Sequence, residues 1–232
     1  MAYSIVILSR NVGNLRACLV GIRKNQPNAR VIVVDDGLGD WPQSRINLES
    51  YVDGEKPFIF SRNANIGIRA AGDDDVILCN DDAVLMTIDG FSWLHQAAVG
   101  YPEYGILSSS IHGFVGNPEQ KHWVSGSGYI QRSDNIRPIT GHTVAFICVH
   151  LPRTLINELG PLDERLIHYG WEDNLYCLQA RARGYKLGVY DGCVVEHGTL
   201  PSTYRDSGQP VNNGNQEIFE SIVKEKDLES FL

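Results

Sequence analysis

Three polar residues, Asn80, Asp81 and Asp82, follow directly on the apolar run at positions 76–79. Such a run is typical of a strand that is covered on both faces in a parallel sheet. Carboxylate and amide oxygens at the end of that strand are hard ligands, suited to Mg²⁺ or Mn²⁺ that also binds phosphate oxygens. The structural alternative is that the aspartates cap the turn after the strand.

A further metal ligand could come from His197, which ends a distant apolar run. A metal ion bound between Asp82 and His197 would act as a Lewis acid. It would stabilise the charge that builds on a leaving diphosphate without any proton transfer.

A second acidic group, Glu172 and Asp173, follows Trp171 and begins a segment with helical spacing. A carboxylate such as Asp173 can accept a proton from a hydroxyl group, which typically contributes about 10²- to 10⁴-fold in rate. Trp171 and Glu172 are then candidates for contact with the hydroxyl-bearing molecule. The structural alternative is that Asp and Glu in a helix's first turn serve capping and the helix dipole.

The pair Asp35 and Asp36 follows another apolar run, at positions 31–34, and precedes Gly37. Its carboxylates could hydrogen-bond a nucleobase and ribose, while the glycine permits close backbone approach. An Asp-Gly turn is the alternative. The segment 63–67, which contains Asn63 and Gly67, is either part of the same site or only a loop.

The elements that must position these residues begin with a β-α-β unit. Positions 3–8 and 31–34 are continuous apolar runs, and between them apolar residues recur with helical spacing at Leu15, Cys18, Leu19 and Ile22. Ligands in open α/β sheets bind beyond the carboxyl ends of the strands. The polar residues after positions 8, 34 and 79 are therefore expected to converge, and residues 1–85 are predicted to form a nucleotide-binding half.

The second half, residues 100–205, is predicted to form an acceptor-side surface. Positions 100–140 are rich in Gly, Ser, Tyr and Pro and favour loops and short strands. A strand is predicted over 142–149, a short helix from Pro152 to near Gly160, a helix from Glu172 to Gly184, and one or two strands over 186–195. The tail, residues 206–232, is predicted to contain a short amphipathic helix.

Composition bounds the possible partners and compartment. The chain has 232 residues, and its 20 Lys+Arg against 28 Asp+Glu give a formal net charge of −8, which offers no broad attraction to nucleic acid or anionic lipid. Five scattered cysteines without a C-x-x-C pair favour buried thiols and a reducing compartment. No apolar stretch approaches the roughly 20 residues of a transmembrane helix. The prediction is a cytoplasmic protein, with peripheral membrane contact left open.

Taken in order, these segments resemble the family-2 glycosyltransferases of the GT-A fold, particularly the rhamnosyltransferase-like branch. The resemblance covers about residues 3–200. It rests on the first strand with its polar end at 9–11, the strand ending in Asp35, Asp36 and Gly37, the segment 63–67, and the D-x-D-like stretch 80–82. In the second half it rests on the stretches 160–164, 172–186 and 194–197.

The resemblance implies a single α/β domain, residues 1–205, with a Rossmann-like, mostly parallel twisted sheet flanked by helices. It also implies an inverting transfer of a sugar from a UDP- or dTDP-sugar to a hydroxyl of a glycan, lipid-linked saccharide, protein or modified base. Asp173 would be the base, and Asp82 and His197 would bind Mn²⁺ or Mg²⁺. The residues expected at the donor nucleotide are Ser9, Asn11, Asp35, Asp36, Asn63, Gly67, Asn80 and Asp81.

The chain departs from many relatives at Leu175 and Gln179, where an Asp and an Arg are common, and at Asn80, which replaces an Asp. One alternative is therefore an inactive module that binds nucleotide sugars or glycans. Another is a nucleotidyltransferase, for which residues 9–13 are a poor version of the Gly-rich phosphate loop that such an enzyme needs.

Overall fold

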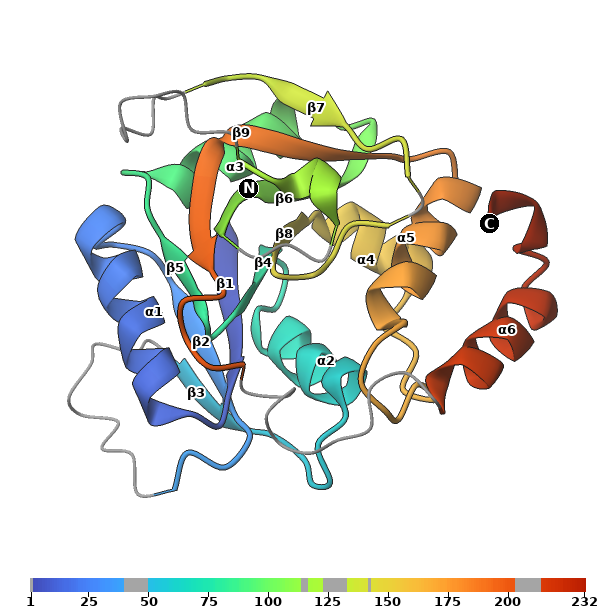
Figure 1. Ribbon diagram of the computed structural model, residues 1–232, viewed down its shortest axis with the longest axis horizontal. Coiled ribbons are helices and arrows are strands. Elements are labelled where there is room, and N and C mark those ends of the chain that lie inside the picture. The colour runs from blue at the N-terminus through green and yellow to red at the C-terminus, as the bar shows by residue number, and fades with distance from the viewer. Residues whose placement is uncertain (1, 40–49, 114–116, 123–132, 142, 203–213) are drawn as a thin grey trace.

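The computed structural model describes residues 2–39, 50–113, 117–122, 133–141, 143–202 and 214–232. One nine-stranded sheet runs through the molecule, and helices cover both of its faces (Figure 1). The described residues thus form a mixed α/β fold, in agreement with the sequence.

The first half of the sheet is parallel. Its central strand, β1 (Tyr3–Ser9), pairs on one side with β2 (Val31–Asp35) and on the other with β4 (Asp75–Asn80), and β3 (Ser50–Asp53) pairs with β2. The apolar residues of β1, β2 and β4 are almost fully buried, because helices pack on both sides of these strands.

The second half of the sheet contains most of the antiparallel pairs. The strand β8 (Cys148–Leu151) lies between β4 and β6 (Tyr104–Gly113) and is antiparallel to both. β9 (Lys186–His197) is parallel to β6, and two short strands are antiparallel to β9: β5 (Ala83–Leu85) and β7 (Ile136–Pro138). The parallel arrangement is therefore confined to the first four strands and to the β6–β9 pair.

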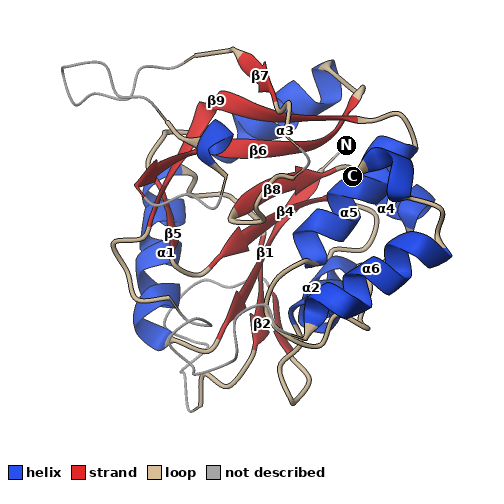
Figure 2. Ribbon diagram, turned by 45° about the vertical axis from the view of Figure 1, so that its right-hand side comes forward, coloured by secondary structure: helices blue, strands red, loops and turns tan. Residues whose placement is uncertain are grey.

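Two layers of helices enclose the sheet (Figure 2). One face carries α1 (Val12–Asn25) and α3 (Gly90–Gly100), and the other carries α2 (Phe60–Ala70), α4 (Arg153–Leu159) and α5 (Glu172–Ala182). Outside α5 lies α6 (Asn215–Glu225), and two short 3₁₀ helices complete the described elements: Pro118–Gln120 and Glu229–Phe231.

The helix α1 forms as the spacing predicts, since its apolar stripe of Leu15, Cys18, Leu19 and Ile22 is buried against the sheet. Asn11 caps its amino end, where its Oδ1 accepts the backbone N–H of Asn14 at 3.1 Å. The predicted helices from Pro152 and from Glu172, and the amphipathic helix in the tail, are also present.

One alternative left open by the sequence and one sequence prediction need correction. Residues 63–67 are not a loop but the middle of α2. The strand predicted over 142–149 begins only at Cys148, because the preceding residues bond elsewhere: the N–H of Ala145 donates to Gln120 Oε1 at 2.8 Å, and Phe146 N–H to the Asp173 carboxylate.

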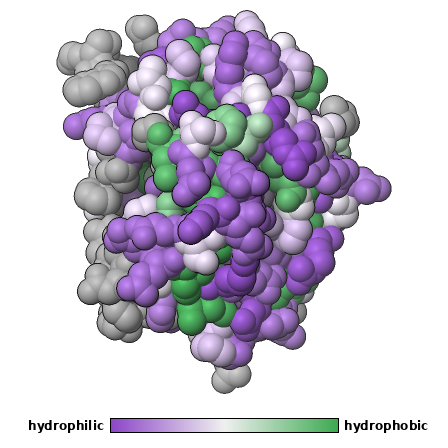
Figure 3. Space-filling model, turned by 90° about the vertical axis from the view of Figure 1, so that its right-hand side faces the viewer, coloured by the Kyte–Doolittle hydropathy of each residue, from purple (hydrophilic) through white to green (hydrophobic). Residues whose placement is uncertain are grey.

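The surface over α6 is mostly polar. Figure 3 shows this side of the molecule, where hydrophilic residues predominate and hydrophobic residues show in separate places. In the part of the chain that the structure describes, no helix combines the length and the apolar character needed to cross a membrane.

Candidate active site

The carboxyl ends of β1, β2 and β4 meet at one edge of the sheet, as the sequence predicts. Ser9 Oγ donates to Asp81 Oδ2 at 2.6 Å, and the carbonyl of Ser9 accepts the N–H of Asp36 at 2.8 Å. These contacts bring Ser9, Asp36 and Asp81 together, and all three residues are buried. This carboxyl edge is the frame of the candidate site.

Asp36 is 1% exposed, and only one of its carboxylate oxygens is paired. Oδ1 lies 2.6 Å from Lys56 Nζ and 3.4 Å from Asn63 Nδ2, whereas the buried Oδ2 has no hydrogen-bond partner in the described residues. Burial raises the pKa of Asp36, and the Lys56 ammonium partly opposes that shift. Oδ2 is thus an acceptor that a bound molecule could satisfy.

Both carboxylate oxygens of Asp35, by contrast, already accept hydrogen bonds, one from its own turn and one from Tyr51. Oδ1 accepts the N–H groups of Gly37 and Leu38 at 2.5 and 2.6 Å, and the Tyr51 hydroxyl donates to Oδ2. Partial burial alone would raise the pKa of Asp35, but these hydrogen bonds outweigh it and lower the pKa. The Asp-Gly turn, which the sequence offered as an alternative, therefore accounts for Asp35. Asp36 is the residue that keeps an unpaired carboxylate oxygen.

The other predicted donor residues occupy different settings. Asn63, on α2, accepts the Glu55 N–H at 2.9 Å and so holds the loop beside Asp36. Gly67 lies further along α2 against the sheet, where a side chain would overlap Val6, so helix packing accounts for this glycine. Asn80 ends β4 and is half-buried.

Asp82 and His197 lie together although they come from distant parts of the chain. Asp82 follows β4 and His197 ends β9, and their Oδ1 and Nε2 atoms are 3.5 Å apart. Both residues are 7% exposed. A carboxylate oxygen and an imidazole nitrogen at this spacing fit a shared divalent metal ion, whose ligands are typically about 3 Å or slightly more apart.

The predicted acidic pair stands at the amino end of α5. Gly170 and Trp171 both have positive φ, at 98° and 78°, and this turn leads into Glu172 and Asp173. Asp173 accepts the N–H of Asn174 at 2.8 Å, and burial raises its pKa. Glu172 is buried, its Oε2 has no described partner, and burial together with the neighbouring Asp173 charge raises its pKa to about 8.

The segment before β8 joins this pair to the carboxyl edge. The N–H of Asn80 donates to the carbonyl of Ile147 at 2.8 Å, and the N–H of the adjacent Phe146 donates to the Asp173 carboxylate. Asn174 Nδ2 also donates to Thr143 Oγ1 at 3.1 Å. Asp173 is thereby held beside the end of β4.

Trp171 turns its ring toward α6, where it packs on Phe219 with ring centroids 4.7 Å apart. Its indole N–H is buried without a hydrogen-bond partner among the described residues. The ring thus braces the turn that carries Glu172 and Asp173.

A separate buried group lies at the opposite, amino edge of the sheet. Asp75 begins β4, His150 lies on β8 and His95 lies on α3, and one donor atom of each lies within 4.8 Å of the others. These three residues could hold a divalent metal. Sequence reasoning missed them because the three residues are far apart in the sequence: Asp75 ends a run of three aspartates, and His95 and His150 stand singly in mainly apolar stretches.

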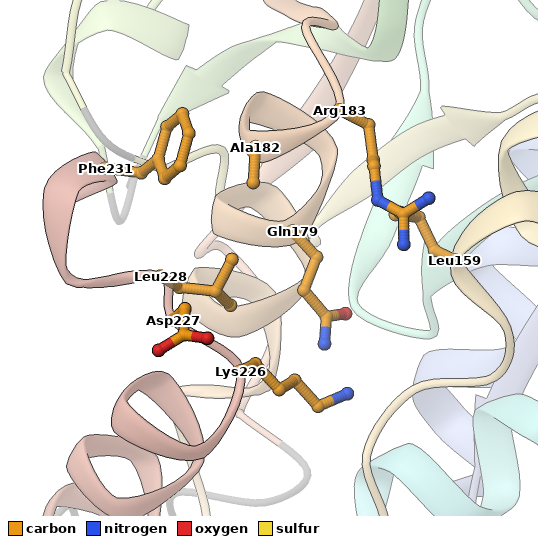
Figure 4. A pocket seen from close by; sticks show the side chains of 8 residues that line it. All are labelled: Leu159, Gln179, Ala182, Arg183, Lys226, Asp227, Leu228 and Phe231. Carbon is orange, nitrogen blue, oxygen red and sulfur yellow. The ribbon is translucent and has the colours of Figure 1, made fainter.

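A pocket opens at the far end of α5 from Asp173 (Figure 4). Ala182, on its wall, is nine residues from Asp173, or about 14 Å along a helix. The pocket is therefore separate from the carboxyl edge. Its lining residues are Leu159, Gln179, Ala182, Arg183, Lys226, Asp227, Leu228 and Phe231.

Glycosyltransferases are among the known structures with a similar fold. GalNAc-T7, solved with UDP, GalNAc and Mn²⁺, matches with a TM-score of 0.68 and 16% identity over 85% of this chain and 44% of that one. S. aureus TarS 1-349 matches with a TM-score of 0.61 and 16% identity over 85% and 60%, and its complex with UDP-GlcNAc with 0.58 and 13% over 90% and 61%.

The fold is therefore that of the GT-A glycosyltransferases. The chain spans less than two thirds of the length of each of these proteins. No protein-family model matches the sequence, and no curated protein sequence matches it either.

Proposed function

We propose that this chain is a glycosyltransferase that moves a hexose or deoxyhexose from a UDP- or dTDP-sugar to a hydroxyl acceptor, with inversion at the anomeric carbon. The observation that carries the proposal is the joining of Asp82, His197 and Asp173 at one sheet edge of a GT-A fold. The rhamnosyltransferase-like branch remains part of the proposal and rests on the sequence motifs alone.

Asp36 is the proposed contact for the donor base. Uracil and thymine both carry one N–H between two carbonyl groups, and the unpaired buried Oδ2 of Asp36 is an acceptor suited to it. Leaving such a buried acceptor without a hydrogen bond costs about 1–3 kcal/mol, which a bound base would recover. The remaining donor contacts are proposed for Ser9, Asn11, Asp35, Asn63, Gly67, Asn80 and Asp81, of which Asp35, Asn63 and Gly67 would act by shaping the site.

Asp82 and His197 are the proposed holders of Mn²⁺ or Mg²⁺. When bound, such an ion supplies Lewis-acid stabilisation of the departing diphosphate. The two side chains lie 3.5 Å apart and are nearly buried, so they offer a carboxylate and an imidazole in a preformed arrangement. The fold neighbour GalNAc-T7 was solved with Mn²⁺.

Asp173 is the proposed base. The acceptor oxygen would attack the anomeric carbon as the bond to the diphosphate breaks, and its proton would pass to the Asp173 carboxylate. Burial raises the pKa of Asp173, which makes it a better proton acceptor. Burial and the neighbouring Asp173 charge raise the pKa of Glu172 to about 8, which favours its protonated form, so Glu172 would serve as a hydrogen-bond donor to the acceptor, next to Trp171.

The deciding experiment is a product assay with a panel of UDP- and dTDP-sugars and hydroxyl acceptors, paired with calorimetry of donor binding. For Asp173→Asn we expect retained donor affinity and a roughly 10²- to 10⁴-fold loss of turnover. Asp227→Asn, an exposed change on the turn after α6, is the matched control and should behave like the wild type.

Near wild-type turnover of Asp173→Asn would show that another group is the base. Donor binding without transfer or hydrolysis by the wild-type chain would instead support the inactive binding module. Activity that EDTA does not reduce would contradict the metal assignment.

All five cysteines are free and buried. We propose a reducing compartment, the cytoplasm, because such compartments keep thiols unpaired. The proposed acceptor is a molecule that carries a hydroxyl group.

A further inference from the structure

The amino edge of the sheet holds a group of one carboxylate and two imidazole side chains that the proposed transfer reaction does not use. Asp75 and His150 lie on the neighbouring strands β4 and β8, which Figure 1 shows side by side, and their side chains meet that of His95 from α3. The strand β4 separates Asp75 from Asn80 by five residues, about 17 Å at 3.3 Å per residue. The group is therefore distinct from the Asp82–His197 pair.

The donor atoms of this group form a small triangle. His95 Nδ1 lies 3.0 Å from His150 Nε2, and Asp75 Oδ2 lies 3.3 Å from the former and 3.5 Å from the latter. In a tetrahedral zinc site with bonds of about 2.0–2.1 Å, the ligand atoms are about 3.3–3.4 Å apart. The triangle thus has the size of three corners of such a site.

Hydrogen bonds alone cannot satisfy this triangle. If both ring nitrogens carried hydrogen, two N–H groups would face each other across 3.0 Å. If only one does, the lone pair of the other ring faces the Asp75 carboxylate at 3.3 or 3.5 Å. As long as the Asp75 carboxylate is ionised, one repulsive contact remains in every arrangement, whereas a cation in the centre would accept all three lone pairs.

The surroundings shift the pKa values of His150 and Asp75. Burial lowers the pKa of His150, which favours the neutral ring. Burial alone would raise the pKa of Asp75, but its contacts with His150 and His95 outweigh this and hold the pKa well below its usual value.

The group is also held in place by its neighbours. The other oxygen of Asp75, Oδ1, accepts the N–H of Arg153 at 2.8 Å, and the ring of Tyr3 packs on His95 with centroids 4.9 Å apart. Such supporting contacts orient the ligands of metal sites. His95 is 8% exposed, so the site lies just below the surface.

We propose that Asp75, His95 and His150 form a second metal site, which binds a divalent transition metal of the zinc type. Two imidazoles and one carboxylate favour zinc over Mg²⁺, which prefers oxygen ligands. The bound ion would tie α3 to β4 and β8 and would leave its fourth position to water. This inference does not depend on the proposed transferase activity.

The test is a titration of the chelator-treated full chain with Zn²⁺, without nucleotide sugar, followed by calorimetry. The control is the double variant Asp82→Asn with His197→Gln, which disables only the carboxyl-edge pair. We expect one zinc per chain at the amino edge, retained in the double variant and weakened more than about 100-fold by His95→Gln, since removing even a supporting contact costs about 10- to 100-fold.

Circular dichroism and thermal melting verify that each variant folds, and zinc should raise the melting temperature of the wild type. Co²⁺ gives an independent readout, because a tetrahedral site produces an intense visible spectrum. If His95→Gln does not fold, the Co²⁺ spectrum of the double variant decides whether the amino-edge group binds the metal. The proposal is overturned if the wild type binds no zinc, if His95→Gln binds it equally well, or if the double variant loses it.

Discussion

Glu172 and Asp173 are neighbouring carboxyl groups with different surroundings. Asp173 accepts backbone N–H groups from Asn174 and Phe146, and Glu172 accepts the N–H of Gly170, while Glu172 Oε2 is buried without a described partner. Hydrogen bonds to a carboxylate favour its charged form, and burial disfavours it. Burial raises the pKa of both groups, and the neighbouring Asp173 charge adds to the shift of Glu172.

This difference predicts a pH dependence of stability. The pKa of Glu172 is raised from 4.5 to about 8 by folding, so between these values the folded state holds a proton that the unfolded state has released. The stabilisation is complete below the lower pKa and is lost as pH rises through about 8, at about 1.4 kcal/mol per pKa unit.

Denaturant unfolding at several pH values between 5 and 9 measures the effect. We expect the free energy of unfolding of the wild type to fall more steeply with pH than that of Glu172→Gln. Glu229→Gln, at an exposed position, is the control and should follow the wild type. Equal slopes for the wild type and Glu172→Gln would show that Glu172 ionises normally.

At the residue scale, part of the candidate site could be predicted from the sequence and part could not. The types and order of Asp36, Asp82, Asp173 and His197 point to the carboxyl edge, because strand ends carry the ligands in such sheets. The sequence could not tell which of Asp35 and Asp36 keeps an unused oxygen. That depends on Tyr51 and Lys56, whose contacts with the two aspartates arise only on folding.

At the scale of elements, the contact of α2 with the parallel strands depends on Gly67. An added side chain would overlap Val6 of β1 and approach Val34 of β2 to 3.0 Å. We expect Gly67→Ala to destabilise the protein by about 1–3 kcal/mol through overpacking, even though alanine is the better helix former.

Chemical denaturation of Gly67→Ala and of Gly100→Ala tests this expectation. Gly100 ends α3 with no heavy atom near the position of an added methyl group, so its variant should stay within about 0.5 kcal/mol of the wild type. A neutral or stabilising Gly67→Ala would mean that α2 can move away from the sheet without cost.

The strand β6 illustrates why some elements could not be predicted from the sequence. Its centre contains Ser108, Ser109 and Ser110, which favour loops in a pattern-based prediction but are fully buried here. Their hydroxyl groups find distant partners: Ser109 Oγ donates to the Cys148 carbonyl at 3.3 Å and Ser110 Oγ to Asp191 at 2.6 Å. Polar residues are tolerated in a core when such bonds exist.

At the scale of the whole molecule, donor binding should raise stability, since a ligand that binds only the folded state stabilises it. At 100 times the Kd the gain is about 2.7 kcal/mol, which is roughly 5–10 °C for a chain of this size. We expect this shift in melting temperature with UDP- or dTDP-sugar plus Mn²⁺.

The matched comparison is the Asp82→Asn variant, in which the shift caused by adding Mn²⁺ to the nucleotide sugar should largely disappear. Purine nucleotide sugars serve as the specificity control and should give a smaller shift. A shift that is the same with and without Mn²⁺ in the wild type would count against metal-assisted donor binding.

The overall topology was predictable only in its first half. Continuous apolar runs around a helical stripe indicate parallel strands, and β1, β2 and β4 form accordingly. The position of β8 between β4 and β6 produces no local pattern in the sequence. It depends on which edge of the sheet is free when the second half of the chain packs.

That insertion has a consequence during synthesis of the chain. Until β8 has been made, β4 ends the parallel half with an unpaired, apolar edge, although β5, β6 and β7 already precede β8 in sequence. Open edges of this kind pair readily with other chains. The β4 edge of the growing chain is thus open to pairing with other chains until residues 148–151 have emerged.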